Sequence, residues 1–565
     1  MVEKRWLQYY DEGIPHTLQP YPDQTLIDVI AETARQRPNH PALYFKAHAM
    51  SYAKLERLSG ACAAALGHLG VHKGDRVALL MPNTPQLIFS MLGTWKAGGI
   101  AVPLNPLYTE NELERALIDC GAETAVVMTL FYNKLKAVQE GTKVRKVIAT
   151  NVKEYLPTML RILFTLLKDK KEGHKIRLQS GDYRLADLCG KYTETPVQGD
   201  RIEPADPAVM LFSGGTTGVP KAVVCTHHAL LITGMQIQSW GKNIWNEWDD
   251  KSMLCLPLFH MSGLGVFSAA TVGHSPSVLI PNPRDIGDLL VTIEKMKPAS
   301  LPGVPSLFNA IINHPRVQSG RVNFSSLKLS TSGAAPLSVD IKDRFENLTG
   351  VRIVEVYTLT ESVLGSVATP VMGKHKRGAV GIPLPDIEIR ITDEDTGKGD
   401  LPPGEVGEIL MRAPQLMKEY WRQPTETADT IRDGWLYTGD LGYLDEDGFL
   451  FFVERKKDVI KPGGFQVWPH EVEEVIASHP AVAEAAVAGV PDPDQAEAVK
   501  AWIVLHEGQQ LSAKELREYC RKSLVAYKVP KYIELRDSLP KSTIGKILRR
   551  ELATKEKELD SMKST

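Results

Sequence analysis

Residues 213–221 read S-G-G-T-T-G-V-P-K, a stretch with three glycines, two threonines and a lysine. This composition favours phosphate binding, because backbone N–H groups reach phosphate oxygens only where side chains are absent. The stretch is not a Walker A loop, in which Gly-Lys-Ser/Thr leads directly into a helix. Residues 222–226, A-V-V-C-T, instead predict a strand. The loop is therefore expected to join two strands and to present Lys221 from a flap, with an ordinary tight turn as the alternative.

The composition and charge are typical of a soluble globular chain with several structural units. The chain has 565 residues, of which 43% are hydrophobic and 24% are charged. A chain of this length divides into about three to four units. It has 66 basic and 68 acidic residues, and this balance gives no reason to expect nucleic-acid binding. We therefore expect small-molecule partners.

The cysteines and the N-terminus indicate a cytoplasmic setting. The six cysteines have neither C-x-x-C spacing nor a histidine cluster nearby, which argues against disulfides and structural zinc. The first 16 residues include acidic side chains and no apolar core, so they do not resemble a signal peptide. No stretch approaches the roughly 18 apolar residues that a membrane span needs.

One apolar segment leaves two interpretations open. Residues 155–167, Y-L-P-T-M-L-R-I-L-F-T-L-L, precede the basic run K-D-K-K at 168–171. The more common arrangement is a helix packed on the protein's own body. The alternative is a peripheral contact of 155–171 with the inner face of a membrane.

The first part of the chain alternates strands and helices. Apolar runs predict strands at 77–81, 101–104 and 125–128. Periodic patterns predict helices at 84–97, with Asn83 or Thr84 as the N-cap, and at 110–120. This alternation indicates an α/β fold with parallel-rich sheets flanked by helices. Ligands bind such sheets at the carboxyl ends of the strands.

The later part predicts two smaller units. Strands broken by turns within 387–411 and 440–453 indicate a smaller β subdomain. After the charged run 454–458, a small α/β unit is predicted from a helix at 470–478, a capping box at Ser512-x-x-Glu515, and strands at 485–487, 499–505 and 532–535. We therefore expect a large domain over 1–456 and a small mobile lid domain over 457–565.

Seven stretches together resemble one family. They are 213–221, L-F-H-M (258–261), S-G-A-A-P (332–336), Y-T-L-T-E (357–361), Y-T-G-D (437–440), R-K-K-D-V-I-K (455–461) and L-P-K-S-T-I-G-K (539–546). In order and spacing they resemble the core motifs of the adenylate-forming (ANL) superfamily of acyl-CoA synthetases, adenylation domains and firefly luciferase. The loop form, the opening R-W-L…I-P-H and the insertion at 152–157 are most similar to bacterial long-chain fatty acid CoA ligases.

The resemblance implies a two-step reaction. A fatty acid is activated by ATP to acyl-AMP with release of pyrophosphate, and coenzyme A then forms the thioester and releases AMP. ATP, Mg²⁺ and CoA are thus the implied cofactors and co-substrates. Because a carboxylate approaches a polyanion, positive charge and N–H donors must surround the α-phosphate.

On the phosphate side, the resemblance implies four catalytic residues. Lys546 would bridge the carboxylate and the α-phosphate, and Thr360 would contact that phosphate. Glu361 would hold Mg²⁺, which prefers oxygen ligands. Lys221 would supply charge to the outer phosphates from a flap made of Ser213, Gly214, Gly215, Thr216, Thr217 and Gly218.

On the nucleoside side, the resemblance implies that Tyr357 stacks on adenine. The backbone of Gly333, Ala334 and Ala335 would lie along the base. Asp440 would accept the ribose hydroxyls with Arg455 nearby.

For the second step, the resemblance implies rotation of the C-terminal domain about a hinge at Lys457. After rotation, the pantetheine path would be lined by Lys461, Gly463 and Gly464. His260 would lie between the acyl pocket and the thiol entrance as a packed or gating histidine, and Leu264 and Gly303 would belong to the acyl walls.

Some positions depart from the family pattern and leave alternatives open. Thr358 and Ala222 stand where glycine is usual, and Leu264 stands where some long-chain members carry a tryptophan gate. A medium-chain, aryl or other acid CoA ligase would share the same catalytic residues. A luciferase-like oxygenase and a non-catalytic lipid-binding or uptake protein are further alternatives. Relatives of this kind are often dimers, so a homodimer is also considered.

Overall fold

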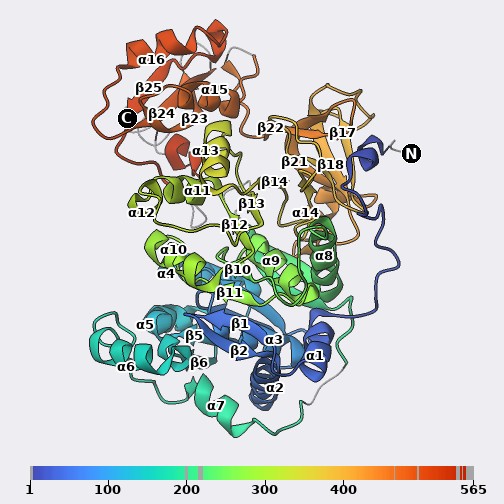
Figure 1. The fold of residues 1–565 in the computed structure, drawn as a ribbon, viewed down its shortest axis with the longest axis vertical. Helices are drawn as coiled ribbons and strands as arrows, with labels where there is room; N and C mark the ends of the chain where they lie inside the picture. Colours follow the sequence, from blue (N-terminus) through green and yellow to red (C-terminus); the bar gives the residue numbers. More distant parts are fainter. Residues whose placement is uncertain are drawn as a thin grey trace.

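The computed structural model describes residues 4–197, 201–213, 220–462, 465–492, 496–541, 547–549, 551–554 and 556. These residues form four sheets, two large and two small. Figure 1 shows the two large sheets in the lower and middle parts of the molecule and the two small ones side by side above them. The predicted α/β class, with parallel-rich sheets, a β subdomain and a small C-terminal unit, is confirmed.

The first large sheet has eight strands and is mainly parallel. Antiparallel pairing is confined to β19, β9 and β8 at one side. In spatial order the strands are β19 (Glu419–Tyr420), β9 (Lys221–Thr226), β8 (Pro207–Ser213), β4 (Ile100–Leu104), β3 (Arg76–Leu80), β5 (Thr124–Met128), β6 (Lys146–Thr150) and β7 (Tyr183–Arg184).

The second large sheet has nine strands, and its central ones are parallel. The antiparallel pairs lie at its two ends. In spatial order the strands are β16 (Ile382–Pro383), β15 (Val367–Ala368), β14 (Ile353–Tyr357), β13 (Leu329–Ser332), β12 (Ser300–Gly303), β10 (Ser252–Leu254), β11 (Ser277–Leu279), β1 (Pro41–Phe45) and β2 (His48–Ser51).

Helices cover both faces of the large sheets. The largest apolar core joins both sheets with six helices: α1 (Leu26–Gln36), α2 (Tyr52–His68), α3 (Pro85–Lys96), α7 (Leu185–Lys191), α8 (His227–Trp240) and α9 (Met261–Val272). A second core lies under α4 (Glu110–Cys120) and α5 (Thr129–Val138). A third core holds α10 (Ile286–Met296), α11 (Pro305–Ile312), α12 (Pro315–Gln318) and α13 (Val339–Thr349). Parallel strands buried on both faces explain the continuous apolar runs in the sequence.

The predicted β subdomain is antiparallel. Its strands are β17 (Glu388–Thr392), β18 (Gly407–Arg412), β21 (Trp435–Leu444), β20 (Ile431–Arg432) and β22 (Leu450–Arg455), with α14 (Pro424–Thr430) beside them. The N-terminal segment crosses to this subdomain, where Trp6 is buried against Gly448. Figure 1 shows the start of the chain beside β17 and β18, far from α1.

The C-terminal unit has its own sheet and core. Its elements are α15 (Pro469–Ala477), β23 (Val482–Asp492), β24 (Ala496–Leu505), α16 (Ala513–Cys520) and β25 (Tyr532–Leu535). The capping box is confirmed, since Ser512 Oγ accepts from Glu515 N and the Glu515 carboxylate accepts from Ser512 N. Such reciprocal bonds satisfy amides that a helix start leaves without partners.

The expected N-cap of α3 is only partly right. Thr84 occupies the N-cap position but makes no side-chain cap, and Pro85 opens the helix. The side chain of Asn83 binds a different segment. Its amide nitrogen donates to the carbonyls of Leu254 and Leu256, and its amide oxygen accepts from Leu258 N at 3.0 Å. Asn83 therefore ties the end of β3 to the segment that follows β10.

The apolar segment forms the short 3-10 helix η3 (Val152–Tyr155) and α6 (Thr158–Leu167). The preferred interpretation, a helix packed on the protein's own body, is wrong for α6, because no residue of this helix is buried. No described helix has both the length and the apolar character to cross a membrane. The remaining helix of this region is α7 (Leu185–Lys191).

Candidate functional site

Three neighbouring parallel strands end together and form the floor of the site. Gly303, Gly333 and Tyr357 stand at or just beyond the carboxyl ends of β12, β13 and β14. Gly333 N donates to Gly303 O at 3.4 Å. A β-carbon on Gly333 would lie 3.1 Å from Val356 O, so this position favours glycine. Ala334 follows at φ +67, a turn conformation that exposes backbone groups at the strand end.

The residues predicted to hold the nucleoside are brought together. The buried hydroxyl of Tyr357 donates to Asp440 Oδ2 at 2.9 Å. Arg455 Nε lies 3.5 Å from Asp440 Oδ1, because β21 and β22 pair these two residues directly. Burial and the Asp440 charge raise the pKa of Tyr357 well above its ordinary value. The tyrosine therefore remains a hydrogen-bond donor at neutral pH.

The residues predicted to act on phosphate also lie together. The hydroxyl of Tyr420 donates to Glu361 Oε1 at 2.9 Å. Lys221 Nζ lies 4.9 Å from the centre of the Tyr420 ring and forms an ion pair with Glu426. Burial, followed by the Glu361 charge, raises the pKa of Tyr420. Thr360 directly precedes Glu361 in the turn after β14.

The phosphate-side and ribose-side groups form one site. Burial lowers the pKa of Arg455, but the nearby charges of Asp440, Asp458, Tyr357 and Glu361 outweigh this effect, so its pKa is raised. Arg455 therefore connects the two groups of residues. Tyr420 and Glu426 were not among the predicted site residues, since both lie outside the seven motifs.

The strand prediction around the glycine-rich loop is confirmed. β8 and β9 are antiparallel, and Ser213 faces Lys221 in their register. Ser213 Oγ donates to Lys221 O at 3.4 Å. The loop therefore starts and ends at one point, which places Lys221 at its base. The predicted loop residues Gly214, Gly215, Thr216, Thr217 and Gly218 lie outside the described residues.

The acyl-side residues occupy one helix start. His260 is the N-cap residue of α9, and Leu264, one turn later, is fully buried. Burial lowers the pKa of His260 to about 4, so its ring is neutral at pH 7. A β-carbon on Gly263 would lie 2.2 Å from Pro257 O, and one on Gly303 would lie 2.9 Å from the Phe308 ring. These glycines permit close packing at the predicted acyl walls.

Several buried polar atoms at these strand ends have no hydrogen-bond partner among the described residues. They are the Oγ atom of Ser332, the Oγ1 atom of Thr358 and Nε2 of His260. Buried polar atoms are normally paired, so a group at this edge that supplies partners is expected. A nucleotide carries hydroxyls, ring nitrogens and phosphate oxygens that can do so. These residues fit ATP.

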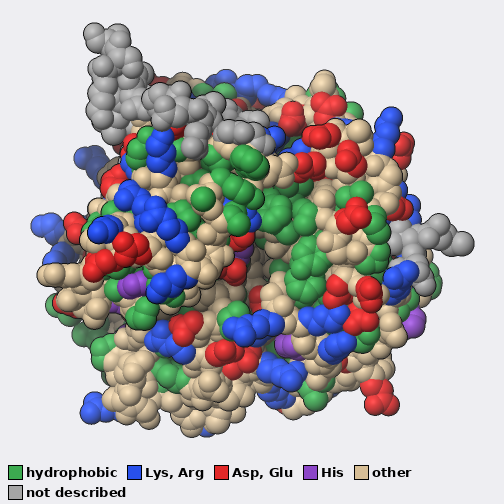
Figure 2. Space-filling model, turned by 90° about the horizontal axis from the view of Figure 1, so that it is seen from above, with side chains coloured by type: hydrophobic (Ala, Val, Ile, Leu, Met, Phe, Trp, Pro, Cys, Tyr) green, Lys and Arg blue, Asp and Glu red, His purple; other side chains and the backbone are tan. Residues whose placement is uncertain are grey.

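The C-terminal unit flanks the site. Seen from above, the surface is hollowed between this unit and the β subdomain, and hydrophobic side chains gather along the hollow (Figure 2). Lys457 and Lys461 are exposed at the start of the unit, and Lys461 N donates to Glu497 Oε2 at 2.6 Å. Three predicted residues, Gly463, Gly464 and Lys546, lie outside the described residues.

Comparison with known families gives a match along most of the chain. Residues 30–421 match the family described as AMP-binding enzyme. Residues 471–546 match the AMP-binding enzyme C-terminal domain. The chain belongs to the AMP-binding enzyme family. The family resemblance inferred from the seven motifs is therefore confirmed.

Individual relatives agree with this membership. The chain is 38% identical over 558 residues to a long-chain-fatty-acid–CoA ligase of Bacillus subtilis, with 98% of this chain and 99% of the relative covered. It is 38% identical over 560 residues to the ligase of the same name from Yersinia pestis, with 98% of each chain covered. Among solved structures, ATP-bound MatB from Rhodopseudomonas palustris superposes with a TM-score of 0.81 at 28% identity, covering 95% of this chain and all (100%) of that one.

Proposed function

We propose that this chain is an AMP-forming ligase that joins long-chain fatty acids to coenzyme A. The carboxylate oxygen of the acid attacks the α-phosphorus of ATP, and pyrophosphate leaves. The thiolate of CoA then attacks the carbonyl carbon of the acyl-AMP, the thioester bond forms and AMP leaves. The relatives from Bacillus subtilis and Yersinia pestis are named for this activity, and the chain aligns with 99% and 98% of their lengths.

The observation that carries this proposal is the connected set of charged groups around Tyr357. On one side, Asp440 and Arg455 form an ion pair at the tyrosine hydroxyl, where a ribose needs an acceptor. On the other side, Tyr420 orients Glu361. A site with a carboxylate for hydroxyls and cations for phosphates suits a nucleoside triphosphate.

The roles of individual residues are part of the proposal. Glu361 would hold Mg²⁺, because its carboxylate is already oriented by Tyr420 and Mg²⁺ prefers oxygen ligands. When bound, Mg²⁺ supplies charge neutralisation to the phosphates. Lys221, which forms an ion pair with Glu426, would release this carboxylate and bind a phosphate of ATP instead. A lysine ammonium group can bind either anion, because it acts as a point charge. Thr360 and Lys546 would contact the α-phosphate.

The hinge at Lys457 and the division into 1–456 and 457–565 are supported by the apolar cores. The cores of the C-terminal unit contain residues from 460 to 552, whereas the other cores contain residues up to 452. Two separate cores allow one unit to rotate against the other without exposing either. Lys461, Gly463 and Gly464 would then approach CoA, with neutral His260 packed at the thiol entrance.

Partners and location are proposed from the same features. The substrates are ATP, a fatty acid and CoA. We infer an enzyme of the cytoplasm that contacts the inner face of a membrane through 155–171, because α6 exposes large apolar side chains. That the protein forms a homodimer stays a prediction. Light scattering of the lipid-free protein tests it.

The experiment that tests the function is AMP formation from ATP and Mg²⁺ with fatty acids of increasing length and one aryl acid, with and without CoA. We expect AMP release that requires CoA and is highest with long chains. If AMP release is highest with medium-chain or aryl acids, the proposed reaction would stand but the proposed substrate would be wrong. ATP binding without turnover for any acid would favour the non-catalytic alternative. In an active enzyme, Lys546→Ala is expected to abolish adenylation.

A further inference from the structure

Helix α6 presents an apolar face that nothing in the described part of the chain covers. The face consists of side chains spaced three or four residues apart, as expected for one side of a helix. Met159 and Leu166 are each 75% exposed, and the face also includes Ile162, Leu163 and Leu167. Figure 1 shows α6 at the outer edge of the molecule, away from the sheets. A patch of this kind marks an interaction site.

The helix is nevertheless held in a defined place. The ring of Phe164, on the opposite side, packs against the His174 ring with their centres 5.1 Å apart. Asp169, just after the helix, accepts from Asn151 at 3.0 Å and pairs with Lys153 at 2.5 Å. The apolar face is thus presented by an anchored helix.

Cations surround this face. Lys168 forms an ion pair with Glu172, and Lys153 forms one with Asp169. Four further cations form no ion pair in the described ranges of the chain: Lys54, Arg161, Lys170 and Lys171. An apolar face with cations at its border is typical of a helix that lies in the interface of an anionic membrane.

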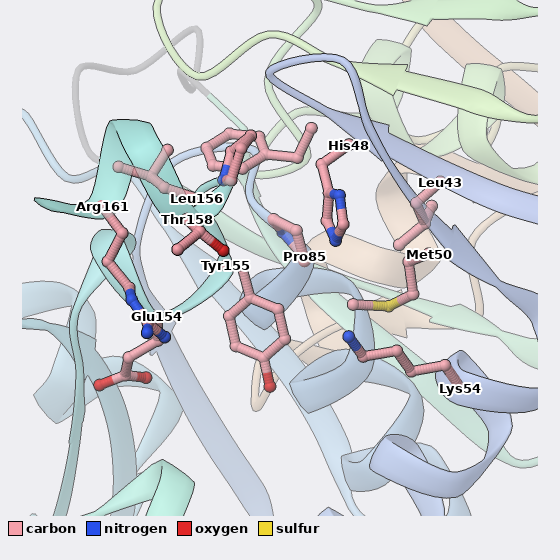
Figure 3. Close-up of a pocket in the computed structure, with 12 residues that line it drawn as sticks. Leu43, His48, Met50, Lys54, Pro85, Glu154, Tyr155, Leu156, Thr158 and Arg161 are labelled. Atoms are coloured by element: carbon pink, nitrogen blue, oxygen red, sulfur yellow. The ribbon is translucent and has the colours of Figure 1, made fainter.

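A cavity of about 200 Å³ opens beside the first turn of α6. We name it the head-group cavity; it lies between β1, β2, the start of α2 and η3. Its walls include the apolar side chains of Leu43, Met50 and Leu156, together with His48 and Lys54. Figure 3 shows the His48 ring and the Lys54 amine extending from β2 and α2 toward Pro85 and Tyr155. The cavity therefore combines cationic and imidazole nitrogens with apolar walls.

The single carboxylate among the residues that line the cavity is already bound. Glu154 accepts from Thr150 Oγ1 at 2.7 Å and from Asn151 N at 3.1 Å. Burial raises the pKa of Glu154 above its ordinary value, which favours the neutral form of this carboxyl and so reduces its repulsion of a bound anion. Lys54 Nζ instead lies near an aromatic ring, 6.0 Å from the centre of Tyr155.

We propose that the head-group cavity binds the phosphate of an anionic phospholipid while α6 lies in the membrane interface. Lys54 and His48 donate to the phosphate oxygens, and Arg161, which also lines the cavity, adds its positive charge there. The acyl chains of the lipid stay in the membrane beside Leu163 and Leu166, because the cavity is too small to hold them. The proposal extends the proposed function, since it rests on an enzyme that takes its fatty acid at a membrane.

A second copy of the chain is the competing occupant of the apolar face. A symmetric pair would bring the cations of both copies together, which is unfavourable without acidic partners. An anionic lipid surface supplies the opposite charge instead. Charge complementarity therefore favours the membrane.

The test is co-sedimentation of the full-length protein with phosphatidylcholine vesicles, with and without phosphatidylglycerol. We expect binding that requires phosphatidylglycerol. Lys54→Gln and His48→Gln change the cavity, Leu163→Ser with Leu166→Ser changes the apolar face, and Lys242→Gln is the control, an exposed lysine just after α8. Lys54→Gln should weaken binding about fivefold, the double serine variant at least about tenfold, and the control not at all.

Several results would overturn the proposal. One is equal binding by Lys54→Gln, His48→Gln and the control. Another is no vesicle binding by the wild-type protein while soluble glycerol phosphate still protects it against thermal unfolding, which would indicate a site for a free phosphate compound. A third is that light scattering shows the wild type as a dimer and the double serine variant as a monomer, while both bind vesicles equally.

Turnover separates this proposal from the proposed function. AMP formation with a water-soluble medium-chain acid should be unchanged in all these variants, because no residue that lines the head-group cavity belongs to the site around Tyr357 and Glu361. A wild-type protein that binds vesicles but never forms AMP would remove the proposed function and leave the lipid site standing. Matching melting temperatures of variants and wild type show that each is folded.

Discussion

The hydroxyl of Tyr420 donates to Glu361 Oε1 at 2.9 Å. Tyr420 lies in β19 of the eight-stranded sheet, and Glu361 follows β14 of the nine-stranded sheet, so this hydrogen bond links the two sheets. The same ring lies 4.9 Å from Lys221 Nζ. Tyr420 therefore contacts the proposed metal ligand and the flap lysine at once. It acts as a positioning residue between the two sheets.

Tyr420→Phe should lower kcat/KM for ATP about tenfold, because a hydrogen bond to a charged group contributes about 1.5 kcal/mol or more. The loss should shrink as the Mg²⁺ concentration rises, since a poorly oriented Glu361 binds the ion more weakly. Pyrophosphate release across a Mg²⁺ titration measures this.

The matched control is Tyr132→Phe, which removes a hydroxyl that donates to Asp182 at 2.5 Å in another part of the molecule. Its Mg²⁺ dependence should equal that of the wild type. An identical Mg²⁺ dependence for Tyr420→Phe would show that the tyrosine does not position a metal ligand.

Asp440→Asn should raise the KM for ATP about tenfold while leaving the fold intact. The amide still accepts from the Tyr357 hydroxyl, but it loses the charge that pairs with Arg455 and that a ribose hydroxyl would use. Steady-state kinetics with varied ATP measures the effect. Asp386→Asn is the control, since Asp386 accepts from the Tyr21 hydroxyl at 2.6 Å. Equal KM values for the two variants would argue against a nucleotide contact at Asp440.

The sequence predicted those features that depend on local pattern. The strands at 77–81 and 125–128 and the helix at 110–120 follow from apolar runs and from side-chain periodicity, and the structure has them as β3, β5 and α4. The strand that follows the glycine-rich loop is predicted by the β-branched run after Pro220, and the structure has it as β9, antiparallel to β8. Each of these is a property of a few consecutive residues.

Other features depend on contacts between distant segments, which no local pattern encodes. Tyr420 and Glu361 are 59 residues apart, and Lys221 and Glu426 are 205 apart. The sequence predicts Asn83 as a cap of α3 because it precedes the helix, yet it binds carbonyls more than 170 residues away. Whether α6 is covered depends on which element lies beside it, and its own sequence fits both outcomes.

Two buried histidines should make the protein less stable below neutral pH. Burial lowers the pKa of His227 and of His260 to about 4. The unfolded chain therefore binds protons near pH 6.5, whereas the folded one does not, so stability is full above pH 6.5 and falls as the pH drops toward 4. Each histidine should cost about 2 kcal/mol at pH 5.

Melting temperatures at pH 7 and pH 5 test this. The decrease between the two pH values should be smaller in His260→Gln and in His227→Gln than in the wild type. His16→Gln, a change at an exposed position, is the control. If the decrease in both buried variants equals that of the control, the histidines are not the source of the acid sensitivity.

Arg549 joins the C-terminal unit to the end of β22, and its loss should be costly. Its Nη1 donates to both oxygens of Glu454 at 3.0 Å, and its Nε donates to Glu473 at 2.8 Å. Arg549→Met leaves the buried carboxylate of Glu454 and the largely buried carboxylate of Glu473 without the cation that they share, which should destabilise the C-terminal unit by about 3–5 kcal/mol. Calorimetry measures the loss, with Arg517→Met as the control because Arg517 donates to the backbone carbonyls of Pro530 and Lys531 rather than to carboxylates.

The loss in Arg549→Met should also depend on pH in a defined direction. Burial already raises the pKa of Glu473, and removal of the arginine should raise it further. A carboxyl whose pKa is higher in the folded than in the unfolded state binds more protons when folded, so the variant gains stability as the pH falls. The destabilisation should therefore be smaller at pH 5 than at pH 7.5. A second change, Glu473→Gln in Arg549→Met, should restore part of the stability at pH 7.5, and no recovery would show that carboxylate repulsion is not the cause.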